Sequence, residues 1–448
     1  MKYVVLCLCV LFVFILAPVQ VAKAAQGRLY VATNGSDSNP GTQRQPFATI
    51  THAASVAVAG QTVVVLEGVY HEVVSITESG STAAPISIVA SPGASVVIDG
   101  TDSPQNADLV TIVGNHILFQ GFEVKNSNAN GIIAWQTEGV SIIGNTVHDA
   151  YLSGILVGSP IDGQQRGASH DNAVRQCIVY RTVLQNSARN TTNWPAALAI
   201  QTSNRATVSH NKVYDNYGEG IAAYLSMATK IVGNEVFDNY SVNIYLDNAP
   251  SAVVDSNFSY STGDSNYFRS GAPAVGIQAA IEPYAFKLPL TDVVIKNNVV
   301  DGTSYGFYYG SYGTGGGMQN SLIANNTFAN VVSAAINIDP DRHSGNEFIN
   351  NIGYRPVSLV QATGSAAGST FGHNCWYEGS VTPEFKGVGD VTGDPRFSAP
   401  SSYSADGYMI PVRSVCAASG RALAAVPVDF WGATRLDPTS SGAHQPTP

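Results

Sequence analysis

Three acidic residues, each in a short segment of small, apolar and aromatic side chains, could carry out acid–base chemistry or bind a metal ion. Glu219 occurs in YGEGI, Asp247 in NIYLDN and Glu282 in GIQAAIEPY. Paired carboxylates act as acid and as base or nucleophile in glycoside hydrolysis. The same oxygens suit Ca²⁺, which can neutralise a substrate uronate and acidify its C5 proton. We therefore expect Asp247, Glu282 and Glu219 to be catalytic, with Asp247 and Glu282 as candidate ligands of a calcium ion.

A proton abstraction of that kind also needs a base with a matched pKa, usually Lys, Arg, His or Tyr. Tyr245 stands beside Asp247 and is our catalytic candidate, and Tyr224 stands at the corresponding place in an earlier segment. Arg269 and Lys287 lie close to inserted stretches near the acids. The identity of the base remains open at this stage.

A sequence repeat determines where these acidic residues and tyrosines lie in the fold. Asn211, Asn234 and Asn257 follow one another at intervals of 23 residues, and a Gly-Ile pair or a near relative begins many of the following short apolar segments. Short β-branched segments at this period, without a leucine-rich pattern, predict a parallel β-helix with coils of about 23 residues. The aligned asparagines then form a ladder of stacked amides, which is a structural feature.

Alternation along the strands places one row of side chains on the outside of the β-helix. The row contains aromatic, amide and acidic side chains, as a sugar-binding groove requires, although outward positions on any soluble sheet tend to be polar. Its members are Trp135, Gly158, Gln201, Tyr224, Asp247, Ala280, Gly310 and Asp339. The side chains that we expect to bind substrate are Trp135, Gln201, Tyr224, Arg269 and Asp339.

The chain divides into four parts by composition. Residues 1–24 have the basic start, apolar run and small-residue ending of a signal peptide cleaved near Ala24, so we expect a secreted protein. Residues 25–60 should form a strand, a loop and a short N-terminal capping helix within 46–58, because an open β-helix end is an exposed sheet edge. Residues 61–355 should form the β-helix, and residues 356–448 a turn-rich covering segment and tail over its other end.

Net charge, hydropathy and cysteine content limit the binding partners and the disulfide bonds that we expect. The net charge is −10, which disfavours nucleic acid as a partner. No later segment is apolar enough to predict a membrane span after signal removal, and a capped solenoid suffices as a monomer. In an exported chain we expect a disulfide between Cys375 and Cys416, and a buried thiol at Cys177 in the repeat.

Two longer segments carry a family resemblance. YVATNGSDSNPGTQRQPFATITHA, followed by GQTVVVLEGVYHE, is similar to the N-terminus of secreted right-handed parallel β-helix proteins of the pectate-lyase-like superfamily, including family-nine pectate lyases. VDFWGATRLDPTSSGAHQ resembles the closing segment of such proteins. The resemblance implies an all-β right-handed parallel β-helix. It favours a polysaccharide lyase acting on an extracellular, uronate-containing glycan.

Other functions stay open, because one fold hosts many chemistries. Family-nine lyases use a lysine as the base, and no lysine of this sequence matches it. The first alternative is a glycoside hydrolase that uses Glu219, Asp247 and Glu282. The second is a non-catalytic carbohydrate-binding or cell-surface protein. The sequence does not identify the polysaccharide.

Overall fold

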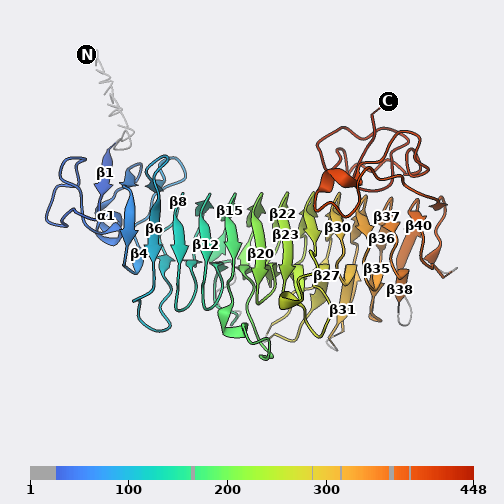
Figure 1. The fold of residues 1–448 in the computed structure, drawn as a ribbon, viewed down its shortest axis with the longest axis horizontal. Coiled ribbons are helices and arrows are strands. Elements are labelled where there is room, and N and C mark those ends of the chain that lie inside the picture. The colour runs from blue at the N-terminus through green and yellow to red at the C-terminus, as the bar shows by residue number, and fades with distance from the viewer. Residues whose placement is uncertain are drawn as a thin grey trace, which may run out of the picture.

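The computed structural model describes residues 27–162, 167–284, 286–312, 315–362, 368–382 and 385–447. Within these ranges the chain winds into a right-handed parallel β-helix, an elongated solenoid with one N-terminal helix, as expected (Figure 1). The expected signal peptide lies outside the described residues. No helix in the described part of the chain is long and apolar enough to cross a membrane.

Each complete coil contributes one strand to each of three long parallel sheets, and the coils at the two ends contribute to fewer. The first sheet contains β1 (Arg28–Val31), β2 (Thr62–Val65), β5 (Ile86–Ala90), β8 (Ile117–Gln120), β11 (Ser141–Ile143), β15 (Ala173–Arg175), β19 (Thr207–Ser209), β22 (Lys230–Val232), β25 (Val253–Asp255), β29 (Val294–Lys296), β33 (Leu322–Ala324), β36 (Asn346–Ile349) and β39 (Ser369–Gly372).

The second sheet carries the functional row. It contains β4 (Val74–Ile76), β7 (Val110–Ile112), β10 (Ile132–Trp135), β13 (Ile155–Gly158), β17 (Leu198–Gln201), β21 (Ile221–Tyr224), β24 (Val242–Asp247), β27 (Val275–Ile281), β31 (Tyr305–Ser311), β35 (Ala334–Ile338) and β38 (Ser358–Ala362).

The third sheet closes the coil between the other two. It contains β3 (Gly68–Tyr70), β6 (Val96–Asp99), β9 (Glu123–Lys125), β12 (Thr146–His148), β16 (Ile178–Tyr180), β20 (Lys212–Asn216), β23 (Glu235–Asn239), β26 (Phe258–Tyr260), β30 (Val299–Asp301), β34 (Thr327–Ala329), β37 (Ile352–Tyr354), β40 (Cys375–Tyr377) and β41 (Val391–Thr392). Two small sheets pair β14 (Ser169–His170) with β18 (Ser203–Asn204) and β28 (Leu290–Thr291) with β32 (Met318–Gln319).

Alternating apolar side chains fill the interior of the solenoid. Ile221 and Ala223 of β21, and Ile244 and Leu246 of β24, belong to one continuous buried core, as their spacing predicts. Each coil thus buries its inward row against the coil before and the coil after it, which is how a solenoid escapes the size limit of a compact core.

The asparagine ladder lies at the turn between the first and third sheets. The Asn211 amide donates to Asn234 Oδ1 at 2.9 Å, and Asn234 donates to Asn257 Oδ1 at 2.9 Å. The series continues through Asn298. Each carbonyl oxygen also accepts a backbone N–H of the neighbouring coil, as Asn257 Oδ1 does from Asn234 N. The structure confirms the ladder and its structural role.

The N-terminal helix α1 (Ile50–Val56) is shorter than the segment expected from the sequence. Thr49 caps it by accepting a hydrogen bond from His52 N at 3.1 Å, so the helix begins three residues after Phe47. The helix buries Ile50, Ala53 and Ala54 against β1, β2 and β4, and so covers the first coil.

The C-terminal region differs from expectation in two ways. The sheets continue past residue 355 to β41, so the coils extend further than the repeat pattern indicated. The residues after β41 fold back along the flank of the last coils instead of covering the end (Figure 1). Lys296 Nζ donates to Ala425 O at 2.7 Å, and Asn350 Nδ2 donates to Arg421 O at 2.8 Å.

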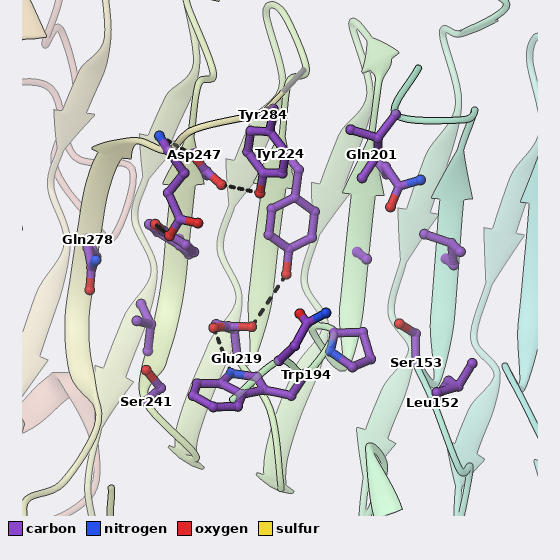
Figure 2. Close-up of a pocket in the computed structure, with 18 of the residues that line it drawn as sticks. Leu152, Ser153, Trp194, Gln201, Glu219, Tyr224, Ser241, Asp247, Gln278 and Tyr284 are labelled. Atoms are coloured by element: carbon purple, nitrogen blue, oxygen red, sulfur yellow. Dashed lines mark hydrogen bonds between the residues drawn. The ribbon is translucent and has the colours of Figure 1, made fainter. Parts of the chain in front are cut away.

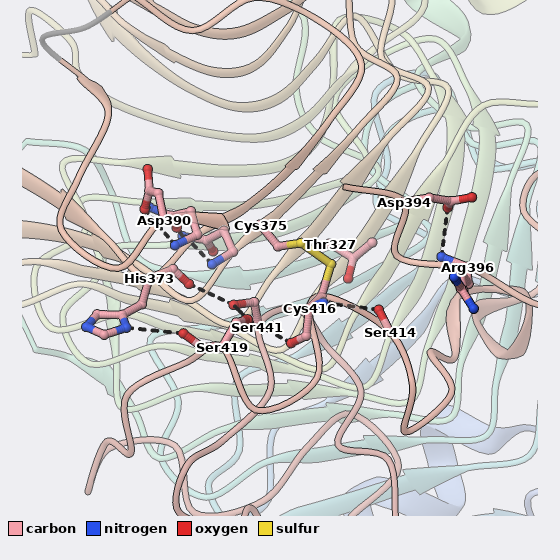
Figure 3. Close-up of a disulfide and its surroundings, with 12 residues drawn as sticks. Thr327, His373, Cys375, Asp390, Asp394, Arg396, Ser414, Cys416, Ser419 and Ser441 are labelled. Atoms are coloured by element: carbon pink, nitrogen blue, oxygen red, sulfur yellow. Dashed lines mark hydrogen bonds between the residues drawn. A yellow bond between two sulfur atoms is a disulfide. The ribbon is translucent and has the colours of Figure 1, made fainter. Parts of the chain in front are cut away.

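A disulfide fastens this tail to the solenoid. Cys375 of β40 is bonded to Cys416, with the two Cα atoms 5.5 Å apart, as expected (Figure 3). Cys177 is a buried free thiol, again as expected, and burial raises its pKa to about 11. The tail also contains η4 (Ala405–Tyr408), a 3₁₀ helix, whose Tyr408 is fully buried.

Candidate active site

The outward row follows the predicted register. Trp135 pairs with Gly158, and the pairing continues through Gln201, Tyr224 and Asp247. Asp247 then pairs with Ala280, and Ala280 with Gly310. One residue per coil therefore reaches the same line along the outside of the second sheet.

Inserted segments convert the middle of this row into a cavity of about 610 Å³. One inserted segment contains η1 (Leu184–Asn186) and Trp194, and the other contains η2 (Ser265–Tyr267) and Arg269. They meet where Arg189 Nη1 donates to Ser265 O at 2.9 Å and where the Arg269 guanidinium lies 4.9 Å from the centre of a Trp194 ring. The sequence predicted an open groove along the sheet. In the structure, the two inserted segments form a wall on one side of that groove.

Most of the predicted site residues line this cavity. They are Gln201, Glu219, Tyr224, Tyr245, Asp247, Arg269 and Glu282. Trp135 and Asp339 do not line it, so the structure gives no support to our expectation that they bind substrate there. Asp339 instead accepts hydrogen bonds from Tyr308 OH and Ser311 N, and the Tyr312 side chain lies between it and the cavity over Gly310. Trp135 lies one coil beyond Gly158, where Asn130 lines the cavity and Trp135 does not.

Glu219 precedes β21 and points into the cavity against Trp194 (Figure 2). Trp194 Nε1 donates to Glu219 Oε1 at 2.8 Å, and Tyr224 OH donates to Glu219 Oε2 at 3.4 Å. Burial raises the pKa of Glu219 to about 7, and the nearby Glu282 charge acts in the same direction. Glu219 therefore holds a proton in a large fraction of molecules at neutral pH.

Asp247 ends β24 and is fully buried. Its Oδ2 accepts a hydrogen bond from Tyr284 OH, and its Oδ1 accepts from Asn248 Nδ2 at 2.8 Å and Glu282 N at 3.2 Å (Figure 2). Burial first, and then the charge of Glu282, raises the pKa of Asp247 to about 7. The hydrogen bonds act against that shift, so desolvation outweighs them.

Glu282 follows β27 in the next coil. Tyr245 OH donates to Glu282 Oε1 at 2.5 Å. Burial is also the main cause that raises the pKa of Tyr245 well above its ordinary value. Tyr245 therefore stays protonated as a donor and is a poor general base, which departs from the catalytic role we expected for it. The same holds for Tyr224, whose pKa burial also raises strongly.

The site also contains residues that were not predicted from the sequence. Trp194, Gln278, Tyr284 and Tyr312 all line the cavity. Tyr284 follows Glu282 by two residues, a spacing that offered a signal for it. Trp194 and Tyr312 could not be placed, because each lies where the repeat is interrupted and the strand alternation gives no register.

The donor set around Asp247 does not fit a calcium ion in the described arrangement. Ca²⁺ takes six to eight oxygen ligands. Both Asp247 oxygens already accept hydrogen bonds, and Glu282 Oε1 accepts one from Tyr245. No group of three or more His, Cys, Asp or Glu side chains arranged to hold a metal occurs among the described residues. Calcium at Asp247 and Glu282 stays a prediction, and we derive no step through it.

The cavity combines acid–base groups with aromatic and amide walls. Among the described lining residues Arg269 is the one strong cation, and neither lysine nor histidine takes part. Two carboxyl groups that hold protons near pH 7 stand beside a third carboxyl, so the site can both donate a proton and accept one.

Comparison with known proteins places this geometry in context. Residues 29–346 match the family described as Pel9A-like, right handed beta helix region. An uncharacterised protein, YwoF of Bacillus subtilis, is 29% identical over 339 residues, which are 66% of this chain and 67% of YwoF. Pectate lyase PEL9 of Emericella nidulans is 38% identical over 90 residues, covering 19% of this chain and 22% of the fungal protein.

Solved structures share the fold at low sequence identity. A structure of XylC in complex with xylose has a TM-score of 0.63 at 14% identity, covering 94% of this chain and 98% of XylC. Pectate lyase Pel9A has a TM-score of 0.53 at 14% identity, covering 95% of this chain and 98% of Pel9A. These similarities establish the β-helix architecture, and the reaction must be argued from the site.

Proposed function

Since the chain belongs to the Pel9A-like right-handed β-helix family, we propose that it is a polysaccharide-processing enzyme, and that its cavity hydrolyses glycosidic bonds. The observation that carries the proposal is the set of three carboxyl groups, Glu219, Asp247 and Glu282, in one walled cavity. Hydrolysis moves ahead of the elimination favoured by the sequence, because this cavity offers carboxyl groups in place of a lysine base.

The roles follow from the surroundings of each group. Asp247, which holds a proton near neutral pH, donates it to the glycosidic oxygen as the bond between that oxygen and C1 breaks. Glu282, held by Tyr245, either removes a proton from the attacking water or attacks C1 itself. In the first case the water oxygen becomes the new C1 hydroxyl and its proton passes to Glu282. In the second case water attacks C1 of the glycosyl–enzyme ester, the bond between C1 and Glu282 breaks, and the Asp247 carboxylate takes the proton of that water.

Glu219 is the second proton-holding group and lies on the coil before Asp247. Trp194 and Tyr224 fix the direction of its carboxyl group. A carboxyl in this position can hydrogen-bond a sugar hydroxyl or replace Asp247 as the acid. Exchanging Asp247, Glu282 and Glu219 singly for their amides distinguishes the essential pair from the supporting group.

The charge of the cavity favours a neutral sugar. Three carboxyl groups face one guanidinium, that of Arg269, which also donates to Ser241 Oγ at 2.9 Å. When Glu219 and Asp247 hold their protons, the charge of Arg269 is matched by Glu282, so a uronate would bring a negative charge without a cation to pair with it. Xylose-containing glycans are a reasonable first choice, because the solved structure of XylC contains xylose.

A polysaccharide lyase is the second candidate, supported by family membership and by the fold shared with Pel9A. In that reaction a base removes the C5 proton of a uronate, and the bond between C4 and the glycosidic oxygen breaks to leave a double bond. Arg269 would then pair with the uronate carboxylate. In this second candidate Asp247 and Glu282 would be the residues to hold a calcium ion, which would acidify the C5 proton, and each would first have to give up the hydrogen bonds that its oxygens now accept.

The proposed setting is outside the cell. An N-terminal signal sequence and one disulfide are both typical of exported chains. The proposed partner is an extracellular polysaccharide, bound by a monomer.

The test uses purified protein on xylan, arabinan, β-glucan and polygalacturonate, with Ca²⁺ or with a chelator. New reducing ends and ultraviolet absorbance from unsaturated uronate are followed together. Reducing ends without absorbance, insensitive to chelation, support hydrolysis. Absorbance lost on chelation would replace hydrolysis by the metal-assisted lyase. Binding of a glycan without either product would leave the non-catalytic carbohydrate-binding alternative.

A further inference from the structure

The cavity is asymmetric about its carboxyl groups. Glu219, Asp247 and Glu282 belong to the coils of β21, β24 and β27. Beyond them, Tyr312, which follows β31, is the one lining residue in the described part of the chain. In the other direction the lining continues over three more coils, through Gln201 of β17, Leu156 of β13 and Asn130 before β10. The reacting groups therefore lie toward one end of the space and not at its middle.

Tyr312 forms the wall at the short end. Its ring edge and hydroxyl lie 3.0 and 3.1 Å from where a Cβ on Gly310 would be, so the ring lies across the row at that coil. Gln278 Nε2 donates to Tyr312 OH at 2.8 Å, which ties the ring to the coil before. Ala280, the row member between Asp247 and Gly310, is 0% exposed. The line of the row is thus covered directly after the carboxyl groups.

The long end is lined differently. Gly158 places no side chain in the row, and the Gln201 amide turns to donate to Ser159 O at 2.9 Å. Leu152, Leu156 and Ile161 provide a partly exposed apolar lining there. The described residues that line this half provide aliphatic surface and carry no charge, which suits the apolar faces of sugar rings that are bound and not cleaved.

From this asymmetry we propose that the enzyme removes short units from chain ends, with Tyr312 as the residue that stops the chain. The inference rests on the proposed glycoside cleavage and adds its mode. A sugar unit at the short end meets Tyr312, and the rest of the chain extends over β17 and β13. A polymer segment that continues in both directions would collide with Tyr312, so internal bonds are not presented to Asp247 and Glu282.

The size of the cavity agrees with a short bound segment. Successive coils are spaced by about 4.8 Å, and a cavity of 300–1,000 Å³ accommodates a ligand of drug-like size. At about 610 Å³ the space suits a segment of roughly two or three sugar rings. A short segment at the end of a chain can therefore fill the cavity against Tyr312.

The experiment compares product lengths at low conversion. Hexasaccharides labelled at the reducing end, beginning with xylohexaose, are cleaved to less than about a tenth and separated by size. The parent polymer is digested in parallel while viscosity and reducing ends are followed. The wild-type protein is expected to release one short product length from the first time point, with little loss of viscosity per new reducing end.

Variants test the role of Tyr312 directly. Tyr312→Ala opens the wall and should raise the share of internal cleavage products by at least about tenfold. Tyr312→Phe keeps the ring but loses the hydrogen bond from Gln278. Its share of internal cleavage products should lie between those of the wild-type protein and Tyr312→Ala. Tyr308→Ala is the matched control, because Tyr308 lies on β31, directly before the segment of Tyr312, donates to Asp339 and does not line the cavity. Thermal unfolding of each variant verifies that it is folded.

The outcomes separate this inference from the proposed function. Mixed product lengths from the wild-type protein at low conversion, with rapid loss of viscosity, would overturn the chain-end mode and leave glycoside cleavage intact. So would an unchanged distribution in a folded Tyr312→Ala. Absence of any new ends from every glycan would overturn the proposed function itself, and this inference with it.

Discussion

The asparagine ladder and the carboxyl-lined cavity are both rows of buried polar side chains, stacked coil upon coil. In the ladder, each amide donates to the next amide, and its oxygen accepts from the neighbouring backbone. In the cavity, the residue changes at every coil. Asp247 and Glu219 are buried, and the hydrogen bonds that their carboxyl groups accept come from neutral donors. In the ladder, the amide of each coil makes its hydrogen bonds to the equivalent amide of the next coil. In the cavity, burial destabilises the charged form of the carboxyl groups relative to water.

This difference distinguishes a structural row of polar side chains from a functional one. A repeated, neutral and fully bonded row contributes stability and says little about function. A non-repeating row with raised carboxyl pKa values costs stability, and such a cost is typical of functional sites. Four predictions test this contrast, from the largest expected effect to the smallest.

Loss of a cavity carboxyl should remove activity with little loss of folding. Asp247→Asn cannot donate a proton to the leaving oxygen, so we expect the rate of glycan cleavage to fall by about 10²–10⁴-fold. The measurement is initial rate on the best substrate of the panel. Asp255→Asn, at an outward position of the first sheet paired with Lys296, is the control and should stay near wild type. Retention of most activity in Asp247→Asn would remove this residue from the mechanism.

Loss of an amide from the asparagine ladder should reduce the stability of the fold more than it reduces activity. Asn257→Ala leaves the Asn234 amide and backbone donors buried without their acceptor, so the free energy of unfolding should fall by roughly 2–4 kcal/mol. Denaturant unfolding measures this, with the exposed Asn34→Ala as control. A change below about 0.5 kcal/mol would mean that the ladder is dispensable.

The two rows should also respond differently to pH. The folded pKa of Asp247, about 7, lies above its unfolded value, so the folded state binds more protons between about pH 4 and 7 and stability falls as pH rises through that window. Asp247→Asn removes this penalty. It should raise the free energy of unfolding at pH 8 by roughly 1–3 kcal/mol relative to its effect at pH 4. Asn257→Ala should show no such pH dependence, and equal pH slopes in both variants would contradict the contrast.

The smallest expected effect concerns the residue that orients Glu219. Trp194→Phe keeps a ring under Arg269 but removes the Nε1 donor, which lowers the pKa of Glu219 in the wild-type protein. The pH–rate limb that reports Glu219 should therefore move to higher pH, by up to about one unit. Trp135→Phe, outside the cavity, is the control. A pH profile unchanged by Trp194→Phe would mean that this hydrogen bond does not tune Glu219.

The repeat explains how much of this molecule could be predicted. Spacing alone gave the β-helix, the ladder through Asn211 and Asn234, and the register that brings Gln201, Tyr224 and Asp247 into one line. Inward and outward alternation fixes such features, because each strand repeats the geometry of the one before it. The disulfide between Cys375 and Cys416 was also predicted, because both lie in the turn-rich C-terminal part whereas Cys177 occupies a position of the repeat.

Interruptions of the repeat explain what was missed. Trp194 and Tyr312 lie in segments without alternation, so their entry into the cavity depends on contacts between loops. The burial of Tyr245 follows from the same loops, which cover a row that looked open to solvent. The tail along the flank is held by backbone acceptors such as Ala425 O, which carry no sequence signal.

The central claim is that Asp247 and Glu282 cleave the glycosidic bond by hydrolysis. The most direct measurement is cleavage in water enriched in heavy oxygen, followed by mass spectrometry of the products. Hydrolysis breaks the bond between C1 and oxygen, so the new reducing end should carry the heavy isotope, and Asp247→Asn should yield no such product. An unlabelled reducing end, together with an unsaturated partner fragment, would contradict the account, because elimination leaves the original oxygen on C1.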